Sequence, residues 1–247
     1  MNTTLRQAEA LARDVRALVE SAKIAGLATV ALFPPYPYLL PLMRVLDGST
    51  IETGAQNVSA EDKGAFTGEV SPAMLAELCK WVIIGHSERR QLFGETDELV
   101  NKKVVTALRH GLKPILCIGE TWEQRNAGKA NDVVRAQLEH ALRGVPSLKG
   151  ITIAYEPAWA IGTGMAATPH AAAEVMGGII ARTLTKLHGA QQANDTPLLY
   201  GGSVTPDNAE GFASEPSIHG ALVGGASLNA QEFVQIVQAF LKAKETS

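Results

Sequence analysis

The chain of 247 residues is poor in cysteine and aromatic residues and carries little net charge. Its two cysteines, Cys79 and Cys117, lie far apart in the sequence, which excludes a disulfide framework and favours a reducing cytoplasm. The net charge of −3 argues against a nucleic-acid-binding surface. The best apolar stretch, residues 27–43, is interrupted by four prolines and is shorter than the ~18 residues of a membrane span. We therefore expect no nucleic-acid partner and no membrane partner.

Hydrophobic residues make up 46% of the chain and charged residues 19%, so it can bury a sizeable core. No low-complexity tract or long linker divides it, and its N-terminus lacks the apolar stretch of a signal peptide. These features predict a single cytoplasmic domain over residues 1–247. A small-molecule enzyme is the default class for such a domain.

Two patterns alternate along the chain. Amphipathic helical stretches alternate with short apolar, β-branched runs, which suit strands buried on both faces of a parallel sheet. The first helix starts at Thr4, which can form a capping box with Gln7, and we expect Gly26 to end it. Hydroxyl residues followed by proline start three later helices, at Ser71, Thr168 and Thr205. The expected strands are 27–33, 50–55, 81–84, 114–118, 151–155, 197–200 and 218–223.

Repeated β-then-α units without a domain break favour a β/α barrel or a doubly wound sheet. The pattern contains seven strands and about eight helices, and its first element is a helix. A barrel of eight β/α units would need one more strand before Thr3.

Candidate catalytic residues follow two of the expected strands, at the carboxyl ends where such folds place their active sites. Glu156 follows strand 151–155, and His86 follows strand 81–84 after Gly85. A desolvated carboxylate can act as a base, whereas an ordinary one caps a helix or forms a salt bridge. A lone histidine is more often structural. A helix starting after His86, however, would keep the ring neutral and able to donate a hydrogen bond to a carbonyl.

Glycine clusters follow the last two expected strands, at Gly201-Gly202-Ser203 and Gly224-Gly225. Without side chains, backbone N–H groups can approach an anion closely, and the Ser203 hydroxyl adds a donor. The clusters therefore predict a phosphate site, with a pair of tight turns as the alternative.

The segment from Pro157 to Gly164 combines a bulky apolar tip with glycine hinges, as a lid over a ligand does. A plain surface loop is the alternative, although it would leave Trp159 exposed. A dinucleotide fingerprint at Gly162-x-Gly164-x-x-Ala167 fits poorly, because no acidic residue ends a suitable following strand. No histidine, cysteine and carboxylate spacing suits a metal, so we expect no metal site.

Several segments together resemble the triosephosphate isomerase family, and the resemblance extends over essentially the whole chain. The most specific is 153–164, IAYEPAWAIGTG. The others are 84–90, 116–120, 200–204, 222–228, and 54–57 with 64–69. The resemblance implies a (β/α)8 TIM barrel and a cofactor-free isomerase of glycolysis and gluconeogenesis. Such an enzyme interconverts dihydroxyacetone phosphate and D-glyceraldehyde 3-phosphate through an enediol(ate) intermediate.

The resemblance also assigns roles to individual residues. Glu156 matches the catalytic base, His86 the neutral electrophile and Glu88 a supporting carboxylate. The loop from Gln56 to Glu69 resembles the loop through which the family forms homodimers. The residues that match the phosphate-binding groups are Gly162, Ser203, Gly224 and Gly225.

Two departures from the family pattern accompany the resemblance. Family chains begin with a strand and an Asn-x-Lys segment, and neither has a counterpart that we identify here, so we expect a barrel that lacks its first strand. Without that lysine we expect weak turnover. Met165, in place of a lysine after the lid, should matter little. The alternative to an active isomerase is a low-activity or inactive relative that binds sugar phosphates or dimerises. A Schiff-base aldolase fits poorly, because no lysine ends an expected strand.

Overall fold

The computed structural model describes residues 1–160 and 167–245, with the side chains of the last two of these left aside. Within these residues, seven strands form one parallel sheet in chain order. They are β1 (Ala31–Leu32), β2 (Glu52–Ala55), β3 (Trp81–Ile84), β4 (Lys113–Ile118), β5 (Thr152–Tyr155), β6 (Leu198–Tyr200) and β7 (Gly220–Ala221).

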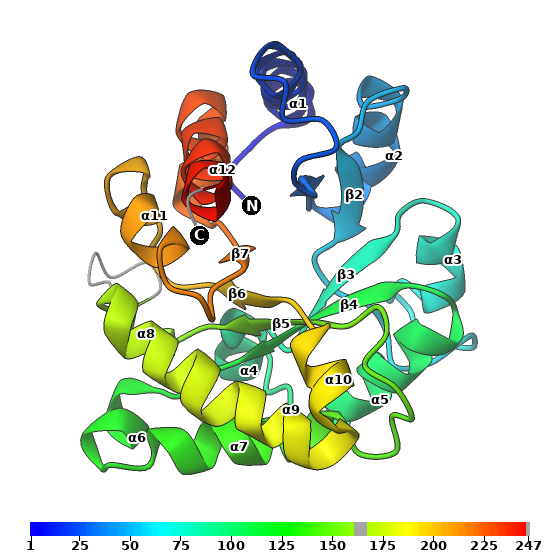
Figure 1. Cartoon of the computed structure of the whole chain (residues 1–247). Helices are drawn as coiled ribbons and strands as arrows, with labels where there is room; N and C mark the ends of the chain where they lie inside the picture. Colours follow the sequence, from blue (N-terminus) through cyan, green and yellow to red (C-terminus); the bar gives the residue numbers. More distant parts are fainter. Residues whose placement is uncertain (161–166, 246–247) are drawn as a thin grey trace.

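Helices surround the sheet, as Figure 1 shows. Because each strand pairs in parallel with its sequence neighbour, all strand carboxyl ends lie at the same edge. The described helices are α1 (Leu5–Ser21), α2 (Tyr36–Val45), α3 (Pro72–Ala76), α4 (Ser87–Leu92), α5 (Asp97–Arg109), α6 (Trp122–Asn126), α7 (Ala130–Ala141), η1 (Ala158–Ala160), α8 (Pro169–Val175), η2 (Met176–Ile180), α9 (Ala181–His188), α10 (Ala190–Asn194), α11 (Pro206–Ala213), η3 (Gly225–Leu228) and α12 (Ala230–Glu245).

Both faces of the central strands are buried, as the continuous apolar runs predict. Along β3, Val82 and Ile84 join the large core between the sheet and its helices, whereas Ile83 points to the other face. There it packs with Ile115 and Ala154 from the two following strands. Alternate side chains of each strand therefore fill two separate apolar layers.

The expected helix starts are confirmed. The Thr4 side chain accepts a hydrogen bond from the Gln7 N–H, and the Gln7 side chain accepts one from the Thr4 N–H. The Ser71 and Thr168 hydroxyls cap α3 and α8 in the same way, and both helices carry proline at the first position. These caps satisfy N–H groups that have no partner inside the helix.

The expectation that Gly26 ends the first helix is wrong. Helix α1 ends at Ser21, and Lys23 takes the left-handed conformation at φ 55°, which reverses the chain. A turn then occupies residues 24–28, in which Leu27 is 64% exposed and its N–H donates to the Ile24 carbonyl. For this reason β1 is limited to Ala31–Leu32 and does not begin at residue 27.

Helix packing links the two edges of the sheet, whereas strand pairing does not. Among the described residues, β1 pairs only with β2 and β7 only with β6. Helix α1 nevertheless packs against both α2 and α12, the helices that follow these two edge strands. Its buried face, Ala8, Ala12, Val15 and Val19, shares one apolar cluster with Leu42 of α2 and with Phe233 and Val234 of α12.

No described helix is both long enough and apolar enough to span a membrane.

Candidate active site

Glu156 and His86, 70 positions apart in the sequence, meet at the carboxyl edge of the sheet. Glu156 follows β5, and His86 lies between β3 and α4. The imidazole Nε2 is 3.4 Å from Glu156 Oε1, and the other carboxylate oxygen accepts a 3.0 Å hydrogen bond from the Ser87 N–H. The structure therefore brings the predicted base and the predicted electrophile into contact.

Glycines on both sides make room for Glu156. A Cβ atom on Gly119 would lie 1.8 Å from the Glu156 carbonyl oxygen, and one on Gly201 would lie 2.7 Å from Glu156 Cγ. The Glu156 N–H donates to the Ile118 carbonyl at 2.7 Å, which continues the β4–β5 ladder by one residue. Strand pairing and glycine contacts together fix where the carboxylate enters the site.

The Glu156 carboxyl is 2% exposed, and this burial raises its pKa above the usual range of a glutamate. Contacts with His86, the Ser87 N–H, the Cys117 thiol and the Arg90 charge oppose part of that increase. Within the described residues, Oε1 is buried and has no hydrogen-bond partner. A desolvated carboxylate with one free oxygen suits a general base, because little water has to leave before it takes a proton.

His86 is the N-cap residue of α4. Its Nδ1 accepts a hydrogen bond of 3.2 Å from the Glu88 N–H, so in the neutral ring the proton belongs to Nε2. That same Nε2 faces Glu156. The helix start therefore selects the tautomer that can donate a hydrogen bond to a substrate oxygen in the site.

Glu88 contributes to this arrangement through its backbone. Its side chain is exposed on the first turn of α4, and its N–H orients the His86 ring. The supporting role of its carboxylate that the resemblance implies stays a prediction.

Three of the predicted phosphate-binding residues, Ser203, Gly224 and Gly225, follow β6 and β7. The Ser203 N–H donates to the Ala160 carbonyl at 3.1 Å, which links the β6 end to η1 at the start of the predicted lid. Gly224 and Gly225 are exposed after β7, and a Cβ atom on either would meet nothing within 4 Å. Gly162 lies outside the described residues, as do the second half of the segment from Pro157 to Gly164 and all of the alternative dinucleotide fingerprint except Ala167.

Glu120 was missed as a functional candidate by the sequence analysis. It is fully buried after β4, and its carboxylate accepts hydrogen bonds from the Tyr155 hydroxyl, Trp159 Nε1 and Arg125. It thus ties the start of the predicted lid to β5, directly beside Glu156. Its place within 116–120, after an apolar run, was the available signal, but its partners come from three other segments.

Cys117 lies beside Glu156, and burial strongly raises the pKa of its thiol. A thiol held in its neutral form packs as a small apolar group and is a poor nucleophile. Among the described residues, no group of three or more histidines, cysteines and carboxylates could hold a metal ion.

These features define an α/β protein with a buried carboxylate and an imidazole in contact at the carboxyl ends of parallel strands. A family model described as triosephosphate isomerase matches residues 1–240. The chain belongs to the triosephosphate isomerase family. Because the match begins at residue 1, this comparison does not support the expectation that the family's first strand is missing.

Individual relatives agree. The triosephosphate isomerase of Caldanaerobacter subterraneus subsp. tengcongensis is 50% identical over 240 residues, covering 96% of this chain and 95% of the relative. The triosephosphate isomerase of Carboxydothermus hydrogenoformans is 50% identical over 227 residues, or 91% and 90% of the two chains. That of Chloroflexus aurantiacus is 46% identical over 245 residues, or 96% and 94%. These relatives confirm the family resemblance and support an isomerase enzyme.

Proposed function

We propose that this protein is a triosephosphate isomerase. It interconverts dihydroxyacetone phosphate and D-glyceraldehyde 3-phosphate without a cofactor, as a step of glycolysis and gluconeogenesis. The observation that carries the proposal is the 3.4 Å contact between His86 Nε2 and the buried Glu156 Oε1. The family membership supports the substrate.

Each of the two groups has one part in the reaction. Glu156 takes the proton from the carbon next to the carbonyl, and the carbon–hydrogen electron pair forms the carbon–carbon double bond of the enediolate. His86 Nε2–H donates to the carbonyl oxygen, where negative charge develops, and moves a proton between the two oxygens. Glu156, which exchanges its proton with solvent while the enediolate is bound, then delivers a proton to the neighbouring carbon. Atoms and charge balance without any other reactant.

A coupled assay tests this proposal directly. Glyceraldehyde 3-phosphate is added, and dihydroxyacetone phosphate is measured through its NADH-dependent reduction by glycerol-3-phosphate dehydrogenase. We expect turnover that Glu156→Gln abolishes, with Arg13→Gln as the control, because Arg13 forms an exposed ion pair with Glu9 on α1. Turnover equal in wild type and Glu156→Gln would contradict the proposal.

We propose that Gly162, Ser203, Gly224 and Gly225 bind the substrate phosphate. The open space above Gly224 and Gly225 supports this, because an anion can approach their backbone closely. The probe is 2-phosphoglycolate, whose carboxylate and phosphate mimic the enediolate. At a hundred times its Kd it should raise Tm by roughly 5–10 °C. No shift at millimolar concentration would contradict a phosphate site.

We propose that the protein is a homodimer that uses the loop from Gln56 to Glu69. Helix α5 holds the base of this loop: Lys103 donates to Asn57, Thr106 to the Ala60 carbonyl, and Arg109 to Asp62. Beyond this base the loop is exposed, including Phe66, and Leu92 and Phe93 are exposed at the end of α4. Exposed large apolar side chains on an anchored loop suit an interface.

Sedimentation velocity tests the dimer. We expect about twice the 26.2 kDa mass of one chain, and a shift toward the monomer for Phe66→Asp. A monomer at micromolar concentration would contradict it.

Both cysteines, Cys79 and Cys117, are free and buried, which supports our proposal of a cytoplasmic location.

The open sheet favours one second candidate. Because β1 and β7 do not pair with each other in the described residues, the chain could be a barrel relative with low turnover that still binds sugar phosphates or dimerises. Binding of 2-phosphoglycolate without measurable turnover would support this candidate. Turnover within the ordinary enzyme range of about 1–10³ s⁻¹ would reject this candidate.

A further inference from the structure

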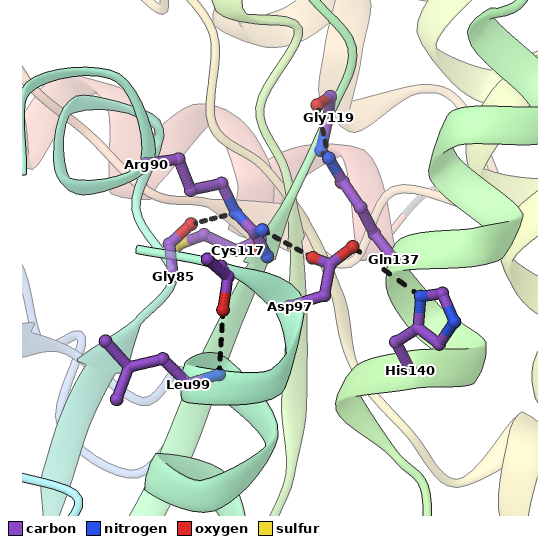
Figure 2. A network of polar contacts seen from close by, with 9 residues as sticks. Gly85, Arg90, Asp97, Leu99, Cys117, Gly119, Gln137 and His140 are labelled. Atoms are coloured by element: carbon purple, nitrogen blue, oxygen red, sulfur yellow. Dashed lines mark hydrogen bonds and ion pairs between the residues drawn. The ribbon is translucent and has the colours of Figure 1, made fainter. Parts of the chain in front are cut away.

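Arg90 makes an unusual set of contacts behind the catalytic residues. Its Nε donates to the Gly85 carbonyl at 2.8 Å, and another guanidinium nitrogen donates to the Cys117 carbonyl at 3.3 Å. The third nitrogen donates to Asp97 Oδ1 at 2.6 Å. Figure 2 shows this guanidinium between Gly85, Cys117 and Asp97. One side chain therefore spans the ends of β3 and β4.

The carbonyl of Gly85 belongs to the same peptide unit as the N–H of His86. Fixing that carbonyl therefore fixes the peptide plane from which the His86 side chain projects. Gly85 has φ 74°, and a Cβ there would lie 3.1 Å from the Arg90 guanidinium, so the turn and the arginine are fitted to each other. A lysine ammonium cannot reproduce this planar set of donors.

The second contact leads to Glu156. Cys117 and Ile118 are consecutive at the end of β4, and the Ile118 carbonyl accepts the Glu156 N–H at 2.7 Å. Arg90 holds the carbonyl one residue before this bond, and the Cys117 thiol itself lies against the Glu156 carboxyl. The same guanidinium thus holds the peptide that leads into His86 and the carbonyl of Cys117, one residue before Ile118, whose carbonyl accepts the Glu156 N–H.

Asp97 completes the arrangement from the other side. It starts α5, so its carboxylate is held at a helix N-terminus, and its second oxygen lies 3.7 Å from His140 Nδ1 on α7. The Arg90 side chain is 15% exposed, so its ion pair with Asp97 is partly shielded from water. Arg90 is therefore held in place by the layer of helices outside the sheet.

We infer that Arg90 is a positioning residue for the reaction, acting through the backbone at Gly85 and Cys117 to set the distance and orientation of His86 relative to Glu156. The inference rests on the proposed isomerase function. Among the described residues Arg90 donates hydrogen bonds to two backbone carbonyls and to Asp97 but to neither catalytic side chain, so it positions the pair through the backbone, while its charge also opposes part of the burial-driven rise in the pKa of Glu156.

The test compares Arg90→Ala and Arg90→Lys with Arg13→Gln in the full chain. We expect both Arg90 variants to lower kcat by about 10- to 100-fold with KM changed less than threefold, because misplacement of a reacting group by ~1 Å costs about that much. Arg13→Gln should leave both constants unchanged, because it removes only an exposed ion pair on α1.

Chemical rescue separates positioning from a loss of packing. A cleft of about 470 Å³ lined by Arg90, Asp97 and His140 opens beside the guanidinium and admits a small cation. Guanidinium chloride at 10 mM should raise the kcat of Arg90→Ala at least fivefold, whereas 10 mM urea or sodium chloride should leave it unchanged. Loss of kcat without rescue, in a variant with unchanged melting, would overturn the inference.

A signal from His86 tests the inference independently of turnover. In 15N-histidine-labelled protein, with the His86 resonance assigned by its loss in His86→Gln, wild type should show one fixed tautomer with the proton on Nε2. Arg90→Lys, the variant that keeps the charge in case Arg90→Ala does not fold, should show an average of both tautomers. An unchanged His86 signal in a folded Arg90 variant would overturn the inference. Absence of turnover in wild type would instead defeat the proposed function.

Discussion

The two halves of the candidate active site differ in how completely the protein builds them. At the ends of β3 to β6, Glu156 is buried between Gly119 and Gly201 and touches His86. After β7, Gly224 and Gly225 are exposed, and a Cβ atom on either would meet nothing within 4 Å. The acid–base half is thus arranged before a ligand arrives, whereas the anion half leaves space for the ligand.

The difference follows from the chemistry of each half. A general base must be desolvated and aimed within a fraction of an ångström, so it needs buried contacts on every side. A phosphate is a large, hydrated anion, and backbone N–H groups can bind it only if no side chain stands in front of them. Substitutions in the first half should therefore affect kcat and stability. Those in the second should affect ligand binding alone.

The largest expected effect is that of Glu156→Asp. Shortening the side chain withdraws the carboxylate from the substrate carbon while keeping its charge. We expect kcat to fall by about 10²–10⁴-fold, with much less change in KM. Steady-state kinetics in both directions measure this, and a kcat within threefold of wild type would remove Glu156 as the base.

Replacing His86 with Gln should come next. Glutamine can still donate a hydrogen bond but cannot pass a proton between two oxygens, so kcat should fall by about 10²–10³-fold. Binding of 2-phosphoglycolate, followed by calorimetry, should change less than kcat, because the phosphate half is untouched. An equal loss of binding and turnover would show that the two halves are not separable.

A matched pair of glycine substitutions probes the comparison itself. In Gly201→Ala the new methyl group would lie 2.7 Å from Glu156 Cγ, so we expect a loss of about 1–3 kcal/mol of stability. In Gly225→Ala the new methyl group would have no other atom within 4 Å, so Tm should stay the same while 2-phosphoglycolate binds more weakly. If both variants melted alike and bound alike, the distinction between the halves would fail.

The smallest expected effect is on the pH dependence of stability. Burial raises the folded-state pKa of Glu156 above 4.5, its value in the unfolded chain, so the charged carboxylate destabilises the fold. This cost is absent below the unfolded pKa and grows as pH rises through the folded pKa. Glu156→Gln should therefore melt a few degrees higher than wild type at pH 8 and equally at pH 4. A gain that is the same at both pH values would contradict the pKa argument.

The raised pKa also governs activity. Only the deprotonated carboxylate can take the proton from carbon, so kcat/KM should fall on the acid side with an apparent pKa above that of an ordinary glutamate. The pH profile of the Arg13→Gln control should coincide with that of wild type.

The sequence predicted the central strands well and the edge strands less well. β3 is found at the predicted residues, and β4 and β5 differ by one, because apolar runs buried on both faces have a single consistent register. β1 is much shorter than predicted, because exposed Leu27 belongs to a turn and β1 has one pairing neighbour among the described residues. An apolar run alone does not reveal which of its residues find a partner.

The contact between Glu156 and His86 could be predicted, because parallel strands place their carboxyl ends on one edge. The roles of Glu120 and Arg90 could not. Glu120 is defined by three side chains from other segments, and Arg90 by two carbonyls and a carboxylate. Such contacts depend on side-chain packing between distant elements, which periodicity and spacing do not encode.

The proposed reaction requires a carboxylate that exchanges a substrate proton with solvent. Glyceraldehyde 3-phosphate converted by the protein in D2O should give dihydroxyacetone phosphate that carries deuterium at the newly protonated carbon, as measured by proton NMR. Conversion that leaves no deuterium in the product would indicate direct hydrogen transfer between the carbons and contradict the account.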